Sequence, residues 1–385
     1  MPLPTPDRDG LAYSAALTRH IATQIDAAGG WIGFDRFMDL ALYAPGMGYY
    51  SGGARKFGAA GDFVTAPELT SAFSQTIGAQ VAQILTLSAP QIVEVGAGSG
   101  RLAADLLLEL ERRSALPESY GILDLSGELR ARQRATIAER APHLLARVSW
   151  LDRLPERFAG LVLANELLDA MPVHLVHWRS AGIAERGVCF DQGQFTWADR
   201  PAGGRLLERA QALAEAHALA DGYLSEICLA APAWVAAWAG ILERGALLLI
   251  DYGFPRHEYY HAQRAAGTLM CHYRHHAHGE PFYLPGLQDI TAHVDFTAIV
   301  EAGCEAGLDF LGYTTQASFL LNCGLPEVLA RTPADDTARY LPLANAAQKL
   351  ISPAEMGELF KVIALGKGIA EPLLGFVRGD RSATL

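Results

Sequence analysis

The sequence predicts an α/β fold in which a parallel sheet is covered by helices on both faces. Three observations predict it. Half of the 385 residues are hydrophobic, which is enough to bury a large core. From residue 91 onward, short apolar stretches alternate with stretches of helical spacing, as they do in parallel sheets with helical crossovers. A glycine cluster at 96–100 lies where a strand would turn directly into a helix.

The first 88 residues are predicted to form a helical cap and a glycine-rich loop. Apolar side chains recur at helical spacing through 11–44, and Pro45 ends this region. Glycines then recur through 46–61, and long glycine-rich loops in compact proteins are usually functional or mobile. The loop continues into the segment 61–68, directly before the core, and we expect 61–68 to be an active-site loop that closes over bound ligands.

The remaining residues, 89–385, are predicted to form a core with insertions at about 173–243 and 254–294. Strands of the parallel sheet are expected at 91–95, 120–125, 147–151, 160–164 and 246–251. The first insertion is expected to contain an antiparallel meander at 173–200 and helices near 203–218 and 230–243. The second is expected to be a loop rich in His, Tyr, Gly and Pro that runs to about residue 288. The last expected elements are a helix at 295–307 and strands at 308–313 and 360–365.

The charge balance argues against a nucleic-acid partner. The chain carries 31 basic and 42 acidic residues, for a formal net charge of −11. Binding to a nucleic-acid backbone needs a clustered basic patch that releases counterions, and no such patch is visible in the sequence.

Apolar stretches and cysteines indicate a soluble protein of a reducing compartment. The longest apolar stretch, 229–242, contains Pro232 and is shorter than the roughly 20 residues that cross a bilayer. The N-terminus lacks the basic and apolar regions of a signal peptide. The five cysteines are far apart and include no C-x-x-C pair, so neither a disulfide framework nor a thiolate zinc site is expected. We therefore expect a cytoplasmic protein without membrane insertion; the sequence carries no signal for its oligomeric state.

The glycine cluster is the first candidate binding element. Gly96, Gly98 and Gly100 follow Glu94 and open an apolar-periodic helix, so the backbone can approach a ligand and the helix N-terminus supplies free N–H donors. A dinucleotide fingerprint, G-x-G-x-x-G, would need glycine where Arg101 stands. The E-x-G-x-G-x-G spacing instead resembles the S-adenosyl-L-methionine (SAM) loop of class I methyltransferases, whose cofactor is cationic. An ordinary strand-to-helix turn is the alternative.

Acidic residues at the ends of the next two strands are candidate cofactor contacts. Asp124 lies 24 residues after Gly100, where a carboxylate would accept hydrogen bonds from ribose hydroxyls. A helix-capping aspartate is the alternative. Trp150 and Asp152 follow at the third strand, where they offer a ring and an acceptor to an adenine and its amino group. A purely structural role for this pair is equally open.

Three polar residues after the fourth strand are the candidate catalytic residues. Ligands of parallel α/β sheets bind outside the carboxyl ends of the strands, so Asn165, Glu166 and Asp169 should face the transferred group. Two carboxylates three residues apart on one turn can converge on a planar guanidinium, whose fork of donors suits bidentate pairing. A solvated helix face is the alternative.

Six short segments, in this order, resemble the MidA-like methyltransferases over about residues 12–368. They are 48–50, 61–68, 94–100, 165–170, 251–253 and 288–296. The resemblance implies a Rossmann-like class I methyltransferase sheet that is mostly parallel with an antiparallel last strand. It also implies SAM as methyl donor and a protein arginine as acceptor, and it marks Asp62, Phe63 and Thr65 as residues of the active-site loop. Since the family includes a mitochondrial complex I assembly factor described as a protein-arginine methyltransferase, a complex I subunit is a candidate partner.

The sequence departs from the family pattern at two positions. Asp124 stands where glutamate is more usual, and His272 stands where tyrosine is usual. Three hypotheses follow: methylation of a protein arginine, methylation of another acceptor, or a SAM-binding assembly factor with little turnover. A nicotinamide oxidoreductase is disfavoured by Arg101.

A histidine-rich stretch in the second insertion offers possible metal ligands. Its members are Cys271, His272, His275, His276 and His278. Imidazoles at close spacing can bind zinc or nickel, but a loop flanked by Gly and Pro encodes no ligand geometry, so we expect no metal here. A solvated or substrate-contacting loop is the favoured interpretation, with His293 and Asp295 ordering it.

Overall fold

The computed structural model describes residues 3–52 and 65–385; Asp62 and Phe63, two of the predicted loop residues, lie outside them. By its contacts the chain divides into two compact units. The first, called the cap unit, comprises 1–63, 168–233 and 255–293. The second, called the sheet unit, comprises 64–167, 234–254 and 294–385. In this division the helical segment 66–87 belongs with the sheet, and most of the two insertions belong with the N-terminal helices.

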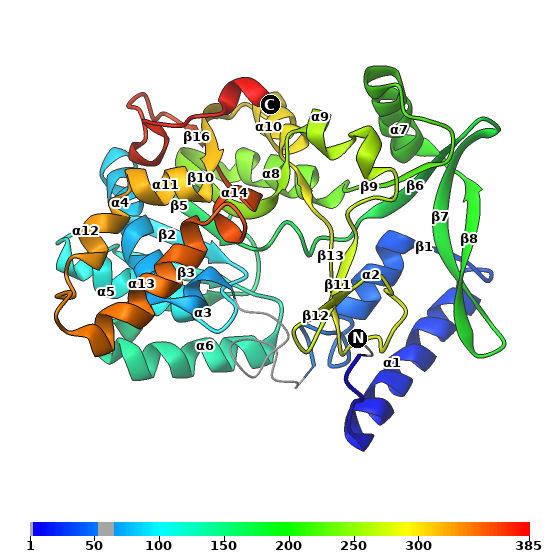
Figure 1. Ribbon diagram of the computed structural model, residues 1–385, viewed down its shortest axis with the longest axis horizontal. Coiled ribbons are helices and arrows are strands. Elements are labelled where there is room, and N and C mark those ends of the chain that lie inside the picture. The colour runs from blue at the N-terminus through cyan, green and yellow to red at the C-terminus, as the bar shows by residue number, and fades with distance from the viewer. Residues whose placement is uncertain (1–2, 53–64) are drawn as a thin grey trace. The chain divides into compact units, whose positions relative to one another are not determined.

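The sheet unit is built on a seven-strand path with one further short strand (Figure 1). Its order is β15-β16-β10-β5-β2-β3-β4, with β14 (Val294–Asp295) pairing with β10. The seven strands are β2 (Gln91–Val95), β3 (Ser119–Leu123), β4 (Val148–Leu151), β5 (Phe158–Asn165), β10 (Leu242–Phe254), β15 (Asp309–Thr315) and β16 (Phe360–Lys367). The strands from β10 to β4 are parallel, whereas β16 is antiparallel to both of its neighbours. The predicted sheet, including the antiparallel last strand, is confirmed.

The strand order creates a switch point beside β2. The chain runs from β2 to β3 and β4 toward one edge, and then returns to form β5 on the other side of β2. In open α/β sheets, ligands bind outside the carboxyl ends of the strands at such a point. The ends of β2 and β5 are therefore where a site is expected.

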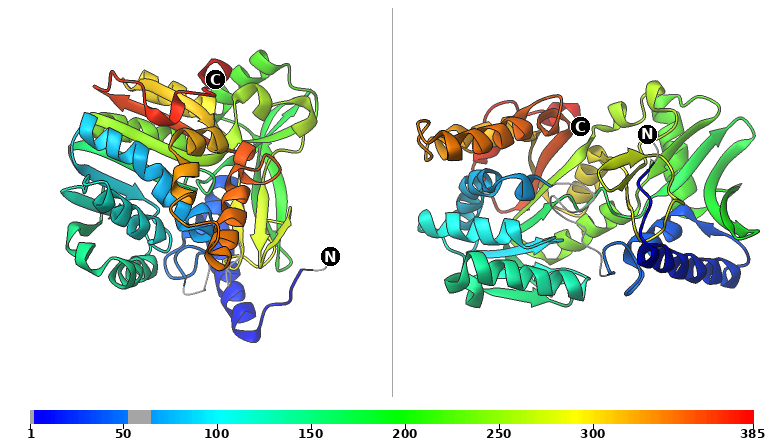
Figure 2. Two further views of the ribbon diagram at one scale, coloured as in Figure 1. Left: turned by 60° about the vertical axis from the view of Figure 1, so that its left-hand side comes forward. Right: turned by 60° about the horizontal axis from the view of Figure 1, so that its bottom comes forward.

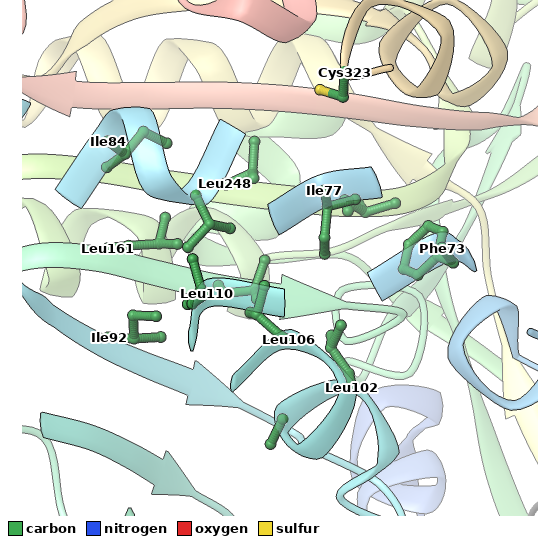
Figure 3. Close-up of a cluster of buried hydrophobic side chains, with 14 of the residues drawn as sticks. Phe73, Ile77, Ile84, Ile92, Leu102, Leu106, Leu110, Leu161, Leu248 and Cys323 are labelled. Atoms are coloured by element: carbon green, nitrogen blue, oxygen red, sulfur yellow. The ribbon is translucent and has the colours of Figure 1, made fainter. Parts of the chain in front are cut away.

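Helices cover both faces of this sheet. On one face α4 (Ser71–Leu87) and α5 (Arg101–Arg112) pack together, and Figure 3 shows their apolar side chains meeting those of β2, β5 and β10. Leu161 and Leu163 of β5 belong to this cluster, while the alternate residue Val162 is equally buried. Since successive strand residues point to opposite faces, the sheet is covered on both sides.

Other helices complete the sheet unit. They are α3 (Ala66–Leu69), α6 (Gly127–Arg140), α8 (Ala230–Ile241, which begins in the cap unit), α10 (Phe296–Glu305), α11 (Gln316–Asn322), α12 (Leu325–Leu329), α13 (Thr337–Ile351) and α14 (Met356–Leu359). The last four lie between β15 and β16, in a segment for which the sequence analysis predicts no element. Short 3-10 turns are η1 (Pro142–Arg147), η3 (Leu374–Phe376) and η4 (Ser382–Thr384).

The cap unit joins the N-terminal helices to an antiparallel sheet. Its helices are α1 (Arg8–Ala27), α2 (Phe34–Tyr43) and α7 (Gly204–His217). Its strands are β1 (Ile32–Gly33), β6 (His174–Arg179), β7 (Gly182–Asp191), β8 (Gln194–Pro201) and β9 (Tyr223–Ile227), in the order β1-β7-β6-β9 with β8 on β7. Figure 2 shows α1, in dark blue, beside the green strands, where it contacts β7. The predicted meander is confirmed as β6, β7 and β8.

The expected loop up to residue 288 is a wrong prediction, because it contains regular structure. It holds α9 (Arg256–Tyr259), η2 (Ala262–Arg264), β11 (Met270–Tyr273) and β12 (His276–His278). The strand β13 (Asp289–Thr291) follows directly after it and completes the sheet β12-β11-β13. Arg274 and His275 form the turn between β11 and β12 with φ of +47° and +63°. Such turns normally carry Gly or Asn, so the usual hairpin signal is missing from this sequence.

Within the described part of the chain, no helix is both long enough and apolar enough to cross a membrane.

Candidate cofactor and acceptor site

The glycine loop follows β2 in a conformation that other residues rarely adopt. The φ angles of Gly96, Gly98 and Gly100 are +69°, +53° and +84°, all in the left-handed region. Gly100 is the N-cap of α5, and a Cβ at this position would lie 2.8 Å from the Cα of Gln133. Glycine is therefore required at 100 both for its backbone conformation and for close packing against α6.

Glu94 lies on β2, inside the sheet, two residues before the first loop glycine. Its side chain is buried, and its Oε2 accepts a hydrogen bond of 2.7 Å from the hydroxyl of Tyr120. Burial raises the pKa of Glu94 to about 7, opposed by the Tyr120 hydrogen bond, while the charge of Asp124 adds to the rise. The carboxyl group is thus poised to ionise near neutral pH, and a nearby cation would favour its charged form.

Asp124 follows β3 and has both carboxylate oxygens oriented. Its Oδ1 accepts the backbone N–H of Ser126 at 2.9 Å, and its Oδ2 accepts from Nε2 of Gln133 at 2.7 Å. Burial raises the pKa of Asp124, and these hydrogen bonds oppose that rise. The N-cap of α6 is Ser126, whose hydroxyl oxygen accepts from the N–H of Leu129, so Asp124 is not the capping residue.

Gln133 of α6 joins three parts of the candidate site and was missed from the sequence. Its Nε2 donates to the Gly98 carbonyl at 3.1 Å as well as to Asp124, and its Oε1 accepts from the indole N–H of Trp150 at 2.9 Å. The side chain is fully buried. A signal existed: Leu129, Gln133 and Ile137 are spaced by four, so an amide interrupts the buried stripe of the helix.

Asp152 follows β4 but projects into solvent. Its side chain is 88% exposed and pairs with Arg130, whose Nη1 lies 2.6 Å from Oδ1. Arg130 also donates to the carbonyls of Asp124 and Leu151, at 2.9 and 2.6 Å. The ring of Trp150 is half-buried and carries the Arg134 guanidinium 4.1 Å from its centroid. The adenine contact of Trp150 and Asp152 stays a prediction.

The end of the predicted active-site loop is tied to the glycine loop. Thr65 is the N-cap residue of α3, which runs from Ala66 to Leu69. From this short helix, Glu68 accepts a hydrogen bond from the hydroxyl of Ser99. The closing motion predicted for the 61–68 segment stays a prediction.

Asn165 and Glu166 end β5 at the switch point. Glu166 has φ of +53°, and its N–H donates to the carbonyl of Ile250 on β10 at 2.9 Å. Asn165 donates to Oε1 of Glu166 at 3.0 Å, while its own Oδ1 is buried without a hydrogen-bond partner among the described residues. Backbone outliers and unsatisfied buried polar atoms gather at functional sites, and here both occur in adjacent residues.

Asp251 of β10 holds the segment that follows Glu166. Its side chain is buried, and its carboxylate accepts the N–H groups of Leu167 at 3.1 Å and of Tyr252 at 2.9 Å. The sequence analysis places Asp251 within a family segment without giving it a role. The structure identifies it as a support for the turn that carries Glu166.

Asp169, the second candidate acid, belongs to the cap unit, whereas Glu166 belongs to the sheet unit. The convergence of the two carboxylates therefore stays a prediction. Asp169 is buried, and its backbone carbonyl accepts from the N–H of Ala292 at 3.0 Å. The next carbonyl, of Ala170, accepts from the Tyr43 hydroxyl at 2.9 Å.

Two tyrosines of the cap unit, Tyr43 and Tyr50, lie near Asp169. The rings of Tyr43 and Tyr50 are stacked with centroids 5.5 Å apart, and the Tyr50 hydroxyl donates to the carboxylate of Asp289 at 2.9 and 3.0 Å. Burial raises the pKa of Tyr50 well above its usual value, and the negative charges of Asp289 and Asp169 add to the rise.

The histidine-rich stretch forms a strand pair. In β11 and β12, Cys271 pairs with His278 and His272 pairs with Ala277. Burial lowers the pKa of His272, with His278 adding to the effect. Within the described ranges, these residues do not bring three metal-donor atoms within 4.8 Å of one another.

Two residues expected to order this stretch have structural contacts. The N–H of His293 donates to the Thr268 hydroxyl at 3.1 Å. Asp295 is the N-cap of α10, and its carboxylate accepts from the N–H of Ala298 at 3.2 Å.

These features define a class of protein. An antiparallel β16 between β15 and β10, together with a glycine loop after β2 and a carboxylate after β3, is the architecture of SAM-dependent methyltransferases of the Rossmann-like type. The chain belongs to the family described as "Putative S-adenosyl-L-methionine-dependent methyltransferase", whose family model matches residues 76–314. It is a methyltransferase with SAM as its cofactor, and the resemblance found in the sequence is confirmed.

Individual relatives agree with this assignment. A superfamily member from Burkholderia thailandensis, crystallised with S-adenosyl-homocysteine, is 56% identical over the whole of both chains, with a TM-score of 0.96. Mitochondrial proteins named protein arginine methyltransferase NDUFAF7 match more distantly. The Danio rerio protein is 26% identical over 92% of this chain and 87% of its own length. The Mus musculus protein is 28% identical over 91% and 84%.

Proposed function

We propose that this protein transfers the methyl group of SAM to a guanidinium nitrogen of an arginine in a protein substrate. The observation that carries the proposal is the end of β5, where Glu166 sits in a left-handed backbone conformation beside the unsatisfied Oδ1 of Asn165. An acid and an acceptor atom held at the switch point suit a cationic side chain that donates several hydrogen bonds. The names of the distant relatives support the same acceptor.

On the cofactor side, we propose that the glycine loop and the acids around it bind SAM. Gly96, Gly98 and Gly100 carry no side chain, so a ligand can approach the backbone closely at these three positions. Glu94 supplies negative charge that suits a cationic cofactor. We assign Asp124 to the ribose hydroxyls, and Asp152 with the neighbouring Trp150 to the adenine.

The acceptor needs carboxylates because a guanidinium stays protonated, with a pKa above about 12, and its nitrogens are then poor nucleophiles. SAM supplies an electrophilic methyl group on a sulfonium sulfur. Glu166 and Asp169 would hold the positive charge on two guanidinium nitrogens, which leaves the third to form the new N–C bond while the S–C bond breaks. One carboxylate then accepts the proton that the methylated nitrogen releases, with Asn165 orienting Glu166.

Mass spectrometry of cells that lack the gene tests this proposal. Arginine methylation on at least one protein should disappear, and it should return with the wild-type gene but not with Glu166→Gln. Loss of methylation on another residue type would favour a different acceptor. If no methylation changes although the purified protein binds SAM, an assembly factor with little turnover is the better description.

Two finer proposals concern the partner and the location. A subunit of respiratory complex I is the proposed substrate on family resemblance alone. A cytoplasmic location is proposed because all five cysteines are free, as is usual in reducing compartments. Fractionation of the producing cells tests the location, and co-purification with complex I subunits tests the partner.

A further inference from the structure

We propose that Asp35, His174 and Glu185 form a binding site for a divalent transition-metal ion of the zinc class. The site lies wholly within the cap unit, at the start of α2 and on β6 and β7. None of its three residues is assigned to the cofactor or to the acceptor above. Since 150 residues separate Asp35 from Glu185, no spacing pattern in the sequence indicates it.

The three side chains already hold their donor atoms close together. Nδ1 of His174 lies 2.7 Å from Oε1 of Glu185 and 3.5 Å from Oδ1 of Asp35, and one donor atom from each residue lies within 4.8 Å of the others. Ligands of one tetrahedral zinc ion, at metal–donor distances of about 2.1 Å, lie about 3.4 Å apart. A small widening of the His174–Glu185 contact is therefore enough to admit an ion.

The charge balance of the cluster favours a cation. Two carboxylates face one imidazole, and in the described part of the chain His174 is the one basic side chain that pairs with either acid. The neighbouring Arg36 pairs instead with Asp39, at 2.5 Å. Even with His174 protonated, the cluster keeps a net charge of −1, because it contains two carboxylates. Imidazole and carboxylate together are a ligand set that zinc accepts.

Another histidine on the same strand provides a contrast. His177 also lies close to an acid, Asp199, at 3.2 Å. There Arg179 and Arg186 pair with the same carboxylate, so its charge is already balanced by arginines. The Asp35 and Glu185 carboxylates have no such arginine partner in the described residues.

Gly33 leaves room between the two carboxylates. Its φ of −60° and ψ of 155° suit any residue, so its backbone does not require glycine. A Cβ there would overlap Oδ1 of Asp35 and lie 2.8 Å from Oε1 of Glu185. The missing side chain therefore preserves the space that an ion would occupy. The three ligand side chains are 18–33% exposed, so an ion and a completing water can reach them.

The test is metal binding by the full-length protein after treatment with a chelator. We expect one equivalent of Zn²⁺ to bind in competition with a chromophoric chelator and to raise the midpoint of thermal unfolding. Asp35→Asn, His174→Gln and Glu185→Gln should each weaken this binding at least about tenfold. His143→Gln is the matched control, because His143 pairs with Glu111 at 2.9 Å without a second acid and should leave the tight site intact.

Cobalt substitution gives a readout that does not depend on the variants folding. Imidazole and carboxylate ligands give Co²⁺ a visible spectrum without the charge-transfer band of thiolate ligands, so that band would assign the site to cysteines and overturn the proposal. Equal Zn²⁺ affinity in the wild type and all three variants would overturn it as well. So would an unfolding midpoint that one equivalent of Zn²⁺ leaves unchanged.

Discussion

Replacement of Gln133 by methionine should weaken SAM binding more than its effect on the stability of the fold explains. The change keeps the side-chain volume but removes the hydrogen bonds to Asp124, Gly98 and Trp150. A bond to a charged group contributes about 1.5–3 kcal/mol and each of the two neutral bonds about 1 kcal/mol, so the free energy of unfolding should fall by about 3.5–5 kcal/mol. Without the Gln133–Asp124 hydrogen bond, SAM has to orient the Asp124 carboxylate when it binds. The roughly 1.5–3 kcal/mol of that bond then corresponds to an affinity loss of about 10- to 100-fold.

Calorimetric titration with SAM and with S-adenosylhomocysteine measures this effect, well below the unfolding midpoint of each variant. Ile137→Ala is the matched control, because Ile137 is buried one turn further along α6 and should cost a similar 2–5 kcal/mol without touching the site. We expect normal affinity in Ile137→Ala and weak affinity in Gln133→Met. Wild-type affinity in Gln133→Met, or an equal loss in both variants, would refute the positioning role of Gln133.

Three further predictions concern other residues of the candidate site. Because burial raises the pKa of Glu94 from 4.5 to about 7, the native state keeps a proton that the unfolded chain releases, so the free energy of unfolding should fall by about 3 kcal/mol as pH rises across this window. Glu94→Gln should flatten that slope in urea titrations at several pH values, and an unchanged slope would contradict the assignment. Glu166→Gln should bind SAM normally but transfer the methyl group about 10²- to 10⁴-fold more slowly. Lysine peptides should be poor substrates of the wild type, because an ammonium lacks the planar fork of donors. Equal turnover of lysine and arginine peptides in a radiolabel assay would count against a guanidinium site. Gly100→Ala should weaken SAM binding at least about tenfold, since its Cβ would meet the backbone of Gln133, and normal affinity by calorimetry would remove the loop from the binding site.

Much of the sheet could be predicted because its strands are short apolar runs with clear ends. The bounds of β2 match the prediction at both ends, since Gly96 with φ of +69° stops the run of QIVEV. The hairpin of β11 and β12 could not be predicted, because its turn lacks the Gly or Asn that usually marks a hairpin. Arg274 and His275 adopt the positive φ angles instead. Tertiary context, not local preference, holds them there.

In the candidate site, too, some residues could be predicted from the sequence and others could not. Asp124 could be located from its distance to the glycine loop, and the structure removes the capping alternative by assigning that role to Ser126. The spacing of buried residues on α6 marks Gln133, but its contact with Asp124 could not be predicted, because the two residues meet only in the folded chain. The left-handed conformation of Glu166 could not be predicted either. The role of Asp152 stays a prediction: its position after β4 suggests a ligand contact, and in the structure it is exposed and pairs with Arg130.

The position of β16 in the sheet has a consequence for biosynthesis. This strand, residues 360–367, leaves the ribosome after every other strand of its sheet, and it pairs with β10 on one side and β15 on the other. Until then β10 exposes the row of backbone groups from Gly245 to Tyr252, which is a template for pairing with other chains. The nascent protein thus completes this sheet only after residues 360–367 have been translated. A premature stop before residue 360 should yield aggregates, a fate distinct from simple loss of activity.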